Sequence, residues 1–198
     1  MNHLAHFHLA GEDPDLIVGG FLGDFVKGRL EDRFPPAITR GIALHRAIDA
    51  FTDQHPVTSL SKSRFSPATR RFAPVMVDII FDYFLARRWE DFHPASLADF
   101  SDNIFSVLLN ADPLLPSSAR RFSEGMRARR SLLRYGTKEF VAASLTHLSA
   151  RLSRPNRMAE GVSEFEQQHA ALEADFLAFY PALINFRDVW LSAEPQND

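Results

Sequence analysis

Apolar residues recur at intervals of three and four along nearly the whole chain, and no long run alternates between apolar and polar residues. This period is typical of an all-α protein and argues against a sheet. Prolines and capping residues divide the pattern into segments, as where Asp13 precedes Pro14. Helices are expected from Pro14 to about Gly28, from Pro36 to Pro56, from about Ala73 to Trp89, from about Ser96 to Leu109, from Ser117 to Arg130, from Lys138 to Leu152 and from Ala159 to Phe179, with Pro181 separating a short last segment.

The length and composition suit one core. The chain has 198 residues, of which 45% are hydrophobic and 18 are Phe. We therefore expect one compact helical domain over residues 1–198, with about seven or eight helices. No apolar run of about 18 residues predicts a membrane span, and no leader resembles a secretory signal, so a cytoplasmic protein is expected. The absence of Cys excludes disulfides, thiolate metal ligands and a Cys nucleophile.

Basic residues concentrate in the segment 117–157, which carries ten of them against two acidic residues, a local balance of +8. Because the whole chain has a net charge of −3, the other residues sum to −11. The asymmetry indicates either a solvated helix surface or a face for an anionic partner, whether nucleic acid, a phosphate-bearing metabolite or an acidic protein. The basic residues are Arg120, Arg121, Arg127, Arg129, Arg130, Arg134, Lys138, Arg151, Arg154 and Arg157.

The stretch GIALHRAIDAFTDQHP places His45, Asp49 and Asp53 four residues apart. On a helix this spacing lines them up along one narrow stripe. The stripe overlaps the apolar arc that contains Ile42, whereas a surface helix would carry its carboxylates on the opposite side. Because a buried, unpaired carboxylate costs several kcal/mol or becomes neutral, these groups need a partner, and a divalent cation is the natural candidate.

The stretch PVMVDIIFDYFLARRW indicates a helix that is apolar on all sides except at Asp78 and Asp82. Such a helix is expected at the centre of the fold. Two carboxylates four residues apart repel each other unless a cation or an arginine lies between them. A buried salt bridge to Arg70, Arg87 or Arg88 is the alternative.

The N-terminal stretch HLAHFHLA adds His3, His6 and His8, and GGFLGDFVKG adds Asp24. The spacing of His6 and His8 directs them to different sides, so at most one of them faces a given ion. Each histidine alone is more often a satisfied core or surface group than a ligand. Asp24 is a stronger candidate, because its glycine neighbours permit close backbone approach.

Histidine and aspartate ligands without Cys suit Mn²⁺, Mg²⁺ or Fe²⁺ better than a structural Zn²⁺. An ion of this kind activates water and polarises phosphoryl oxygens, so hydrolysis of a phosphate ester is the implied chemistry. No motif supports nucleotide-driven, dinucleotide or serine-hydrolase chemistry.

Four ordered stretches carry a resemblance to a known family: MNHLAHFHLA, GDFVKG, FPPAITRGIALHRAIDAFTDQHP and VMVDIIFDYFLARRW. They resemble the acyl carrier protein phosphodiesterase family, densely over residues 1–90 and more loosely through RLSRPNRM and FLAFYPAL. The resemblance implies an α-helical protein related to HD-domain phosphohydrolases. It also implies Mn²⁺-dependent removal of 4′-phosphopantetheine from holo-acyl carrier protein.

This chain departs from the family pattern at two positions. It has Gly20 where the family pattern has Asn, and Tyr83 where the family often has His. The pattern carries over to His6, Asp24, His45, Asp49 and Asp53 and to the pair Asp78 and Asp82.

The roles expected from the resemblance are specific. The ion is expected on Asp24, His45, Asp78 and His6. Asp49 or Asp82 is expected as general base or as the group that orients a ligating histidine. Arg46 is expected either to hold a phosphate oxygen or to be an ordinary surface residue.

The partner expected from the resemblance is holo-acyl carrier protein, a small acidic protein that would dock on the Arg-rich face, with Arg64, Arg70 and Arg71 as further contacts. Neither nucleic acid nor a membrane is then expected as a partner. Two other classes remain open. One is a metal phosphohydrolase acting on a nucleotide or another small phosphate ester, and the other is a non-catalytic helical module in which the His and Asp residues are buried pairs.

Overall fold

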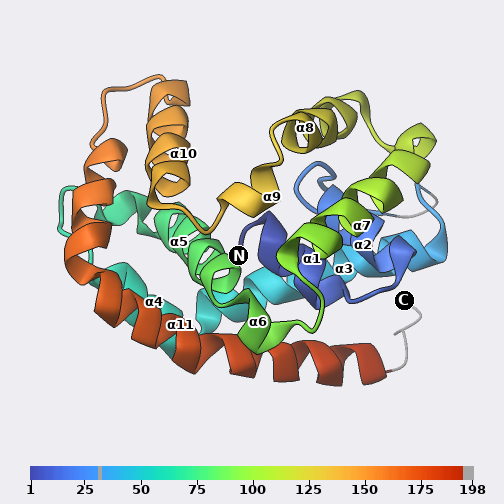
Figure 1. The fold of residues 1–198 in the computed structure, drawn as a ribbon, viewed down its shortest axis with the longest axis horizontal. Helices are drawn as coiled ribbons and strands as arrows, with labels where there is room; N and C mark the ends of the chain where they lie inside the picture. The colour runs from blue at the N-terminus through green and yellow to red at the C-terminus, as the bar shows by residue number, and fades with distance from the viewer. Residues whose placement is uncertain (31–32, 194–198) are drawn as a thin grey trace.

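The computed structural model of the chain describes residues 1–30 and 33–193. Over these residues the protein consists of eleven α-helices and three short 3₁₀ helices, without a strand (Figure 1). The all-α prediction is confirmed, and the number of helices is higher than expected. Residues 31, 32 and 194–198 lie outside the described part. No helix in the described ranges is long and apolar enough to cross a membrane.

The elements follow in the order α1 (His3–Ala10), α2 (Pro14–Leu22), α3 (Pro36–Gln54), α4 (Pro56–Ser63), η1 (Arg70–Phe72), α5 (Ala73–Arg87), α6 (Trp89–Phe92), α7 (Leu97–Asn110), η2 (Asp112–Leu114), α8 (Ser117–Ala128), α9 (Ser131–Arg134), α10 (Lys138–Arg151), η3 (Met158–Glu160) and α11 (Gly161–Ser192).

Helix α5 lies at the centre of the fold, as its sequence predicts. Its side chains are buried from Met76 to Leu85 with the exception of Asp78, which is partly exposed. It contacts α1, α4, α10 and α11. Burial on all sides explains why its sequence lacks a polar face.

Helices α2 and α3 cross at a pair of glycines, Gly19 and Gly41. A Cβ atom on Gly19 would overlap the carbonyl oxygen of Ile38 and the backbone of Gly41. The two backbones can approach this closely only without side chains. The crossing fixes α3 against the end of α2 and thereby brings Asp24 and His45 to the same region.

Two expected helix limits are wrong. Helix α2 ends at Leu22 rather than near Gly28, since a turn begins at Gly23, where the His45 ring occupies the space of a Cβ. Helix α11 runs through Pro181, which was expected to separate a last segment. Proline removes one helical hydrogen bond, but Phe179, Tyr180 and Leu183 on either side of it are fully buried. Burial of these side chains, at about 1.5–3 kcal/mol each, outweighs the loss.

Helices α8 and α10 stand apart from each other on one side of the molecule, with the short helix α9 between them (Figure 1). The N-terminus of the chain lies beneath this opening, near α1 and α5. The basic segment 117–157 forms these three helices and the loop that follows them.

Candidate metal centre

Helix α1 carries His6 into the interior, and a distant carboxylate fixes where it starts. The Asp82 carboxylate of α5 accepts hydrogen bonds from the backbone N–H groups of Leu4 (2.8 Å) and Ala5 (3.2 Å). These are first-turn N–H groups, which have no partner within a helix. Asn2 caps the same turn through a bond from His3 N, 2.9 Å long.

Helix α3 supplies His45 and Asp49 on one side, as their spacing predicts. His45 Nε2 lies 3.2 Å from Asp49 Oδ2, and His45 Nδ1 lies 2.8 Å from the carbonyl oxygen of Gly20. A carbonyl oxygen only accepts, so Nδ1 carries the proton and Nε2 of the neutral ring presents a lone pair toward Asp49. Ligating histidines are oriented in this way, with the second ring nitrogen donating to a carbonyl.

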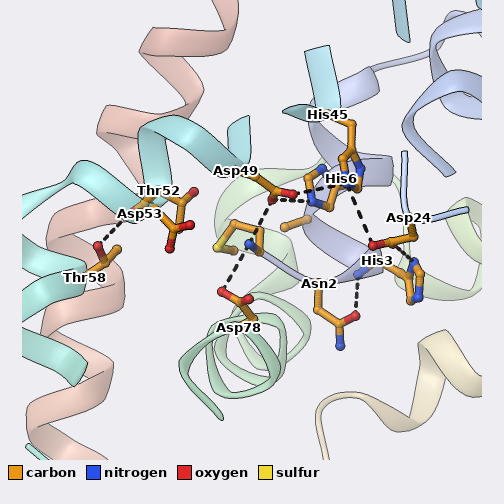
Figure 2. Close-up of polar contacts among 12 residues, drawn as sticks. Asn2, His3, His6, Asp24, His45, Asp49, Thr52, Asp53, Thr58 and Asp78 are labelled. Carbon is orange, nitrogen blue, oxygen red and sulfur yellow. Dashed lines mark hydrogen bonds and ion pairs between the residues drawn. The ribbon is translucent and has the colours of Figure 1, made fainter. Parts of the chain in front are cut away.

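The His6 ring stacks on the His45 ring (Figure 2). His6 Nε2 is 3.2 Å from Asp49 Oδ1, but neither His6 nitrogen has a hydrogen-bond partner, although both are buried. Burial, reinforced by the neighbouring His45, lowers the pKa of His6 to about 4. A buried imidazole without partners is costly in an apolar interior and well suited to bind a cation.

Asp49 lies between the two histidines, and its side chain is 44% exposed. Burial acts to raise its pKa, but the contacts with the His45 and His6 rings outweigh burial and hold the pKa well below its usual range. Ligand atoms of His6, His45 and Asp49 all lie within 4.8 Å of one another. These three residues, called the His-Asp cluster below, have the spacing and the donor types of a site for a divalent cation.

Asp24 borders the His-Asp cluster (Figure 2). Its Oδ1 atom is 3.9 Å from His45 Nε2, and its Oδ2 atom is 3.3 Å from His3 Nδ1. The side chain is 46% exposed. Asp24 can therefore complete a coordination shell from the solvent side or act on a water molecule there.

The Met1 amino group lies between Asp49 and Asp78. The Met1 nitrogen is 3.2 Å from Asp78 Oδ1 and 3.4 Å from Asp49 Oδ1. Burial raises the pKa of Asp78, and the Met1 amine opposes this effect. The structure thus places Asp49, expected as base or orienting group, at the middle of the cluster, and Asp78, expected as a ligand, outside it.

Three other candidates point elsewhere. Asp82 is buried against the start of α1, Arg46 donates to the carbonyl oxygens of Val26 and Gly28, and Asp53 pairs with Lys62 at 2.9 Å. Within residues 1–30 and 33–193, neither carboxylate of α5 forms the alternative ion pair with Arg70, Arg87 or Arg88. Of the arginines considered for it, Arg88 contacts Glu173 and Asp91, and Arg70 contacts carbonyl oxygens.

His6 and His8 face different sides, as their spacing predicts. His8 accepts from the Tyr180 hydroxyl through Nδ1 (2.8 Å) and donates from Nε2 to the carbonyl oxygen of Phe92 (3.1 Å). The sequence did not predict two contacts near the candidate metal centre. One joins His3 to Asp24, and the other joins the Met1 amine to Asp49 and Asp78. No local pattern indicates them, because each pairs the N-terminus with a residue far along the chain.

The fold and the site define an all-α protein with a candidate metal centre made of histidine and aspartate. The acyl carrier protein phosphodiesterase family matches residues 1–183, and the chain belongs to this family.

Individual relatives agree with the family match. The chain is 34% identical over 186 residues to an acyl carrier protein phosphodiesterase of Yersinia enterocolitica, covering 93% of this chain and 96% of the relative. It is 34% identical over 185 residues to one of Serratia proteamaculans and 33% identical over 189 residues to one of Escherichia coli O6:K15:H31, with the same shares covered. No solved structure shows significant similarity to the chain.

Proposed function

We propose that the protein is a metal-dependent phosphodiesterase that hydrolyses the bond between 4′-phosphopantetheine and serine in holo-acyl carrier protein. Water is added across the phosphodiester, which yields apo-acyl carrier protein with a free serine hydroxyl and 4′-phosphopantetheine. The observation that carries the proposal is the His-Asp cluster, which lies within a chain that belongs to this family.

The metal is Mn²⁺, with Mg²⁺ or Fe²⁺ as alternatives. The residues present fit such an ion, because one unpartnered ring nitrogen of His6, the Nε2 atom of His45 and a carboxylate oxygen of Asp49 lie within 4.8 Å of one another. When bound, a divalent cation supplies the positive charge that polarises a phosphoryl oxygen and increases the acidity of water.

The protein groups have separate tasks in this proposal. Gly20 fixes the His45 tautomer through its carbonyl oxygen, and Asp49 balances the charge of the ion. Asp24, about half exposed beside the cluster, is placed to accept the proton of the attacking water. Asp82 and Arg46 are assigned structural tasks, since their polar atoms already serve α1 and the loop at residues 26–28.

Docking of the acidic carrier protein is proposed on the Arg-rich face. Arg129, Arg134 and Arg151 are exposed, and none has a carboxylate within ion-pair distance in the part of the chain described. By contrast, Arg120 pairs with Asp112 and Arg157 with Glu160. Unpaired arginines can steer an acidic protein and fix its orientation. A carrier protein substrate also fits the expected cytoplasmic location.

Mass spectrometry of holo-acyl carrier protein tests the proposal. Incubation with the protein and Mn²⁺ should convert the holo form to the apo form, and chelation should stop the conversion. An unchanged holo mass with Mn²⁺, Mg²⁺ and Fe²⁺ would reject it. Hydrolysis of a nucleotide in the same assays would instead support the alternative phosphohydrolase.

A further inference from the structure

A cavity of about 710 Å³ lies between α8, α9 and α10, where Figure 1 shows these helices standing apart. The cavity opens to solvent, so it is a pocket of the surface rather than a void in the packed interior. Ligand sites typically measure about 300–1,000 Å³. The cavity therefore has the dimensions of a site for a small molecule or for a flexible chain.

One end of the cavity lies beside the His-Asp cluster, through Asp24, although none of the three cluster residues lines the cavity. Asp24, Asp78 and His3 belong to its lining, together with Asn2. Phe122 of α8 stands at this end, with its ring 5.0 Å from the His3 ring. A ligand within the cavity thus extends away from the position where the phosphodiester would be cleaved.

Another part of the cavity wall comes from α5 and α10. Val75 of α5 and Ala143, Ser144, His147 and Leu148 of α10 form it. None of these residues contributes to the His-Asp cluster, so this part of the wall can affect binding of a long substrate without touching the reacting atoms.

The lining combines apolar and hydrogen-bonding groups. Ile79, Met126 and Phe140 supply apolar surface, whereas Ser131 and Tyr135 supply hydroxyl groups. Burial raises the pKa of Tyr135 well above its usual value, so its hydroxyl remains a donor. Such a lining matches a flexible chain that alternates methylene groups with amides, and a nucleotide base and sugar would leave much of the apolar surface unmatched.

We propose that this cavity binds the pantetheine arm of the holo-carrier protein, with the phosphodiester at the Asp24 end and the thiol end between α5 and α10. The carrier protein itself remains outside, against Arg129, Arg134 and Arg151, which also border the cavity. The inference rests on the proposed function and adds where the prosthetic group lies during the reaction.

Filling the cavity tests the inference. Ala143→Trp places an indole in the α10 wall, and Thr146→Trp places the same side chain on an exposed part of α10 outside the lining. Binding of holo- and apo-carrier protein is measured by calorimetry with chelator present, so that no turnover occurs. The wild type and Thr146→Trp should bind the holo form at least about tenfold more tightly than the apo form. Ala143→Trp should bind both forms with the affinity of the apo form.

Activity provides a second readout. With Mn²⁺, Ala143→Trp should convert holo-carrier protein at least about tenfold more slowly than the wild type, whereas Thr146→Trp should convert it at the wild-type rate. Ser144→Trp, at the adjacent lining position, repeats the test if Ala143→Trp does not fold.

Retention of the holo preference by Ala143→Trp, or equal binding of both forms by the wild type, would overturn the inference even if the wild type converts holo-carrier protein. Absence of conversion by the wild type, with the holo preference intact, would refute the proposed function and still support binding of the arm.

Discussion

The imidazole rings of His6 and His45 stack with their centroids 3.8 Å apart and their planes inclined by 18°. The two residues come from α1 and α3, and Asp49 contacts both rings. Stacked imidazoles repel each other when both are protonated, and burial already disfavours the charged form of His6. The pair therefore presents nitrogen lone pairs to the space beside Asp49, which is the condition for binding a cation.

Asp49→Asn should reduce Mn²⁺ binding and turnover of holo-carrier protein by at least about 100-fold, because the site loses its central negative charge. Metal content after dialysis and the rate of conversion measure the two effects. Asp53→Asn is the matched control, since Asp53 follows four residues later on the same helix and pairs with Lys62. Equal losses in both variants would remove Asp49 from the centre.

Asp82→Asn should lower the free energy of unfolding by about 1–3 kcal/mol and leave most of the Mn²⁺ affinity intact. The amide oxygen of the variant can still accept from the N–H group of Leu4 or of Ala5. The amide NH₂ group then faces the other N–H group, and because both are donors, that hydrogen bond is lost. Urea denaturation followed by circular dichroism measures the first effect, and metal titration measures the second. If Asp82→Asn keeps full stability and loses turnover as severely as Asp49→Asn, Asp82 acts in catalysis.

His8 should contribute to acid unfolding between about pH 6.5 and pH 4. Burial lowers its pKa to about 4 in the folded protein, from 6.5 in the unfolded chain. The unfolded chain therefore binds the extra proton throughout this window, and the stabilisation present above pH 6.5 is lost as the pH falls.

Replacement of His8 by Gln removes this titration. His8→Gln should be less stable than the wild type at pH 7. As the pH is lowered from 6.5 to 4, however, its free energy of unfolding should fall less steeply than that of the wild type, and the two slopes should differ by up to about 1.4 kcal/mol per pH unit. Urea denaturation at several pH values, with chelator present in all samples, gives both slopes. Parallel slopes for the two proteins would contradict the assignment.

Reversal of two charges at the cavity, in Arg129→Glu with Arg134→Glu, should slow turnover of holo-carrier protein at least about tenfold and leave a small phosphodiester unaffected. Both arginines border the cavity. The control is Arg121→Glu with Arg154→Glu, which changes the net charge equally at exposed residues outside the cavity lining. If the two double variants lose the same activity, the effect is one of overall charge, and loss of the small substrate as well would remove the docking role.

Much of the fold follows from local pattern. The helical period gave the all-α class and the central position of α5, because apolar residues on every side of a helix can only be buried. The same reasoning placed His45 and Asp49 on one stripe of α3, and it marked the glycines beside Asp24 as a point of close approach, which Gly23 makes with the His45 ring. Each of these conclusions depends on residues within a few turns of one another.

Only the tertiary structure decided which of the carboxylates share a site. Asp49 meets His6, while Asp82 binds the start of α1 and Asp78 lies beyond the Met1 amine. Helical spacing specifies the face on which a side chain lies, but the partner it meets there depends on how helices distant in the sequence pack together. For the same reason α11 continues through Pro181: the buried side chains on both sides of the proline gain more from the shared core than the missing hydrogen bond costs.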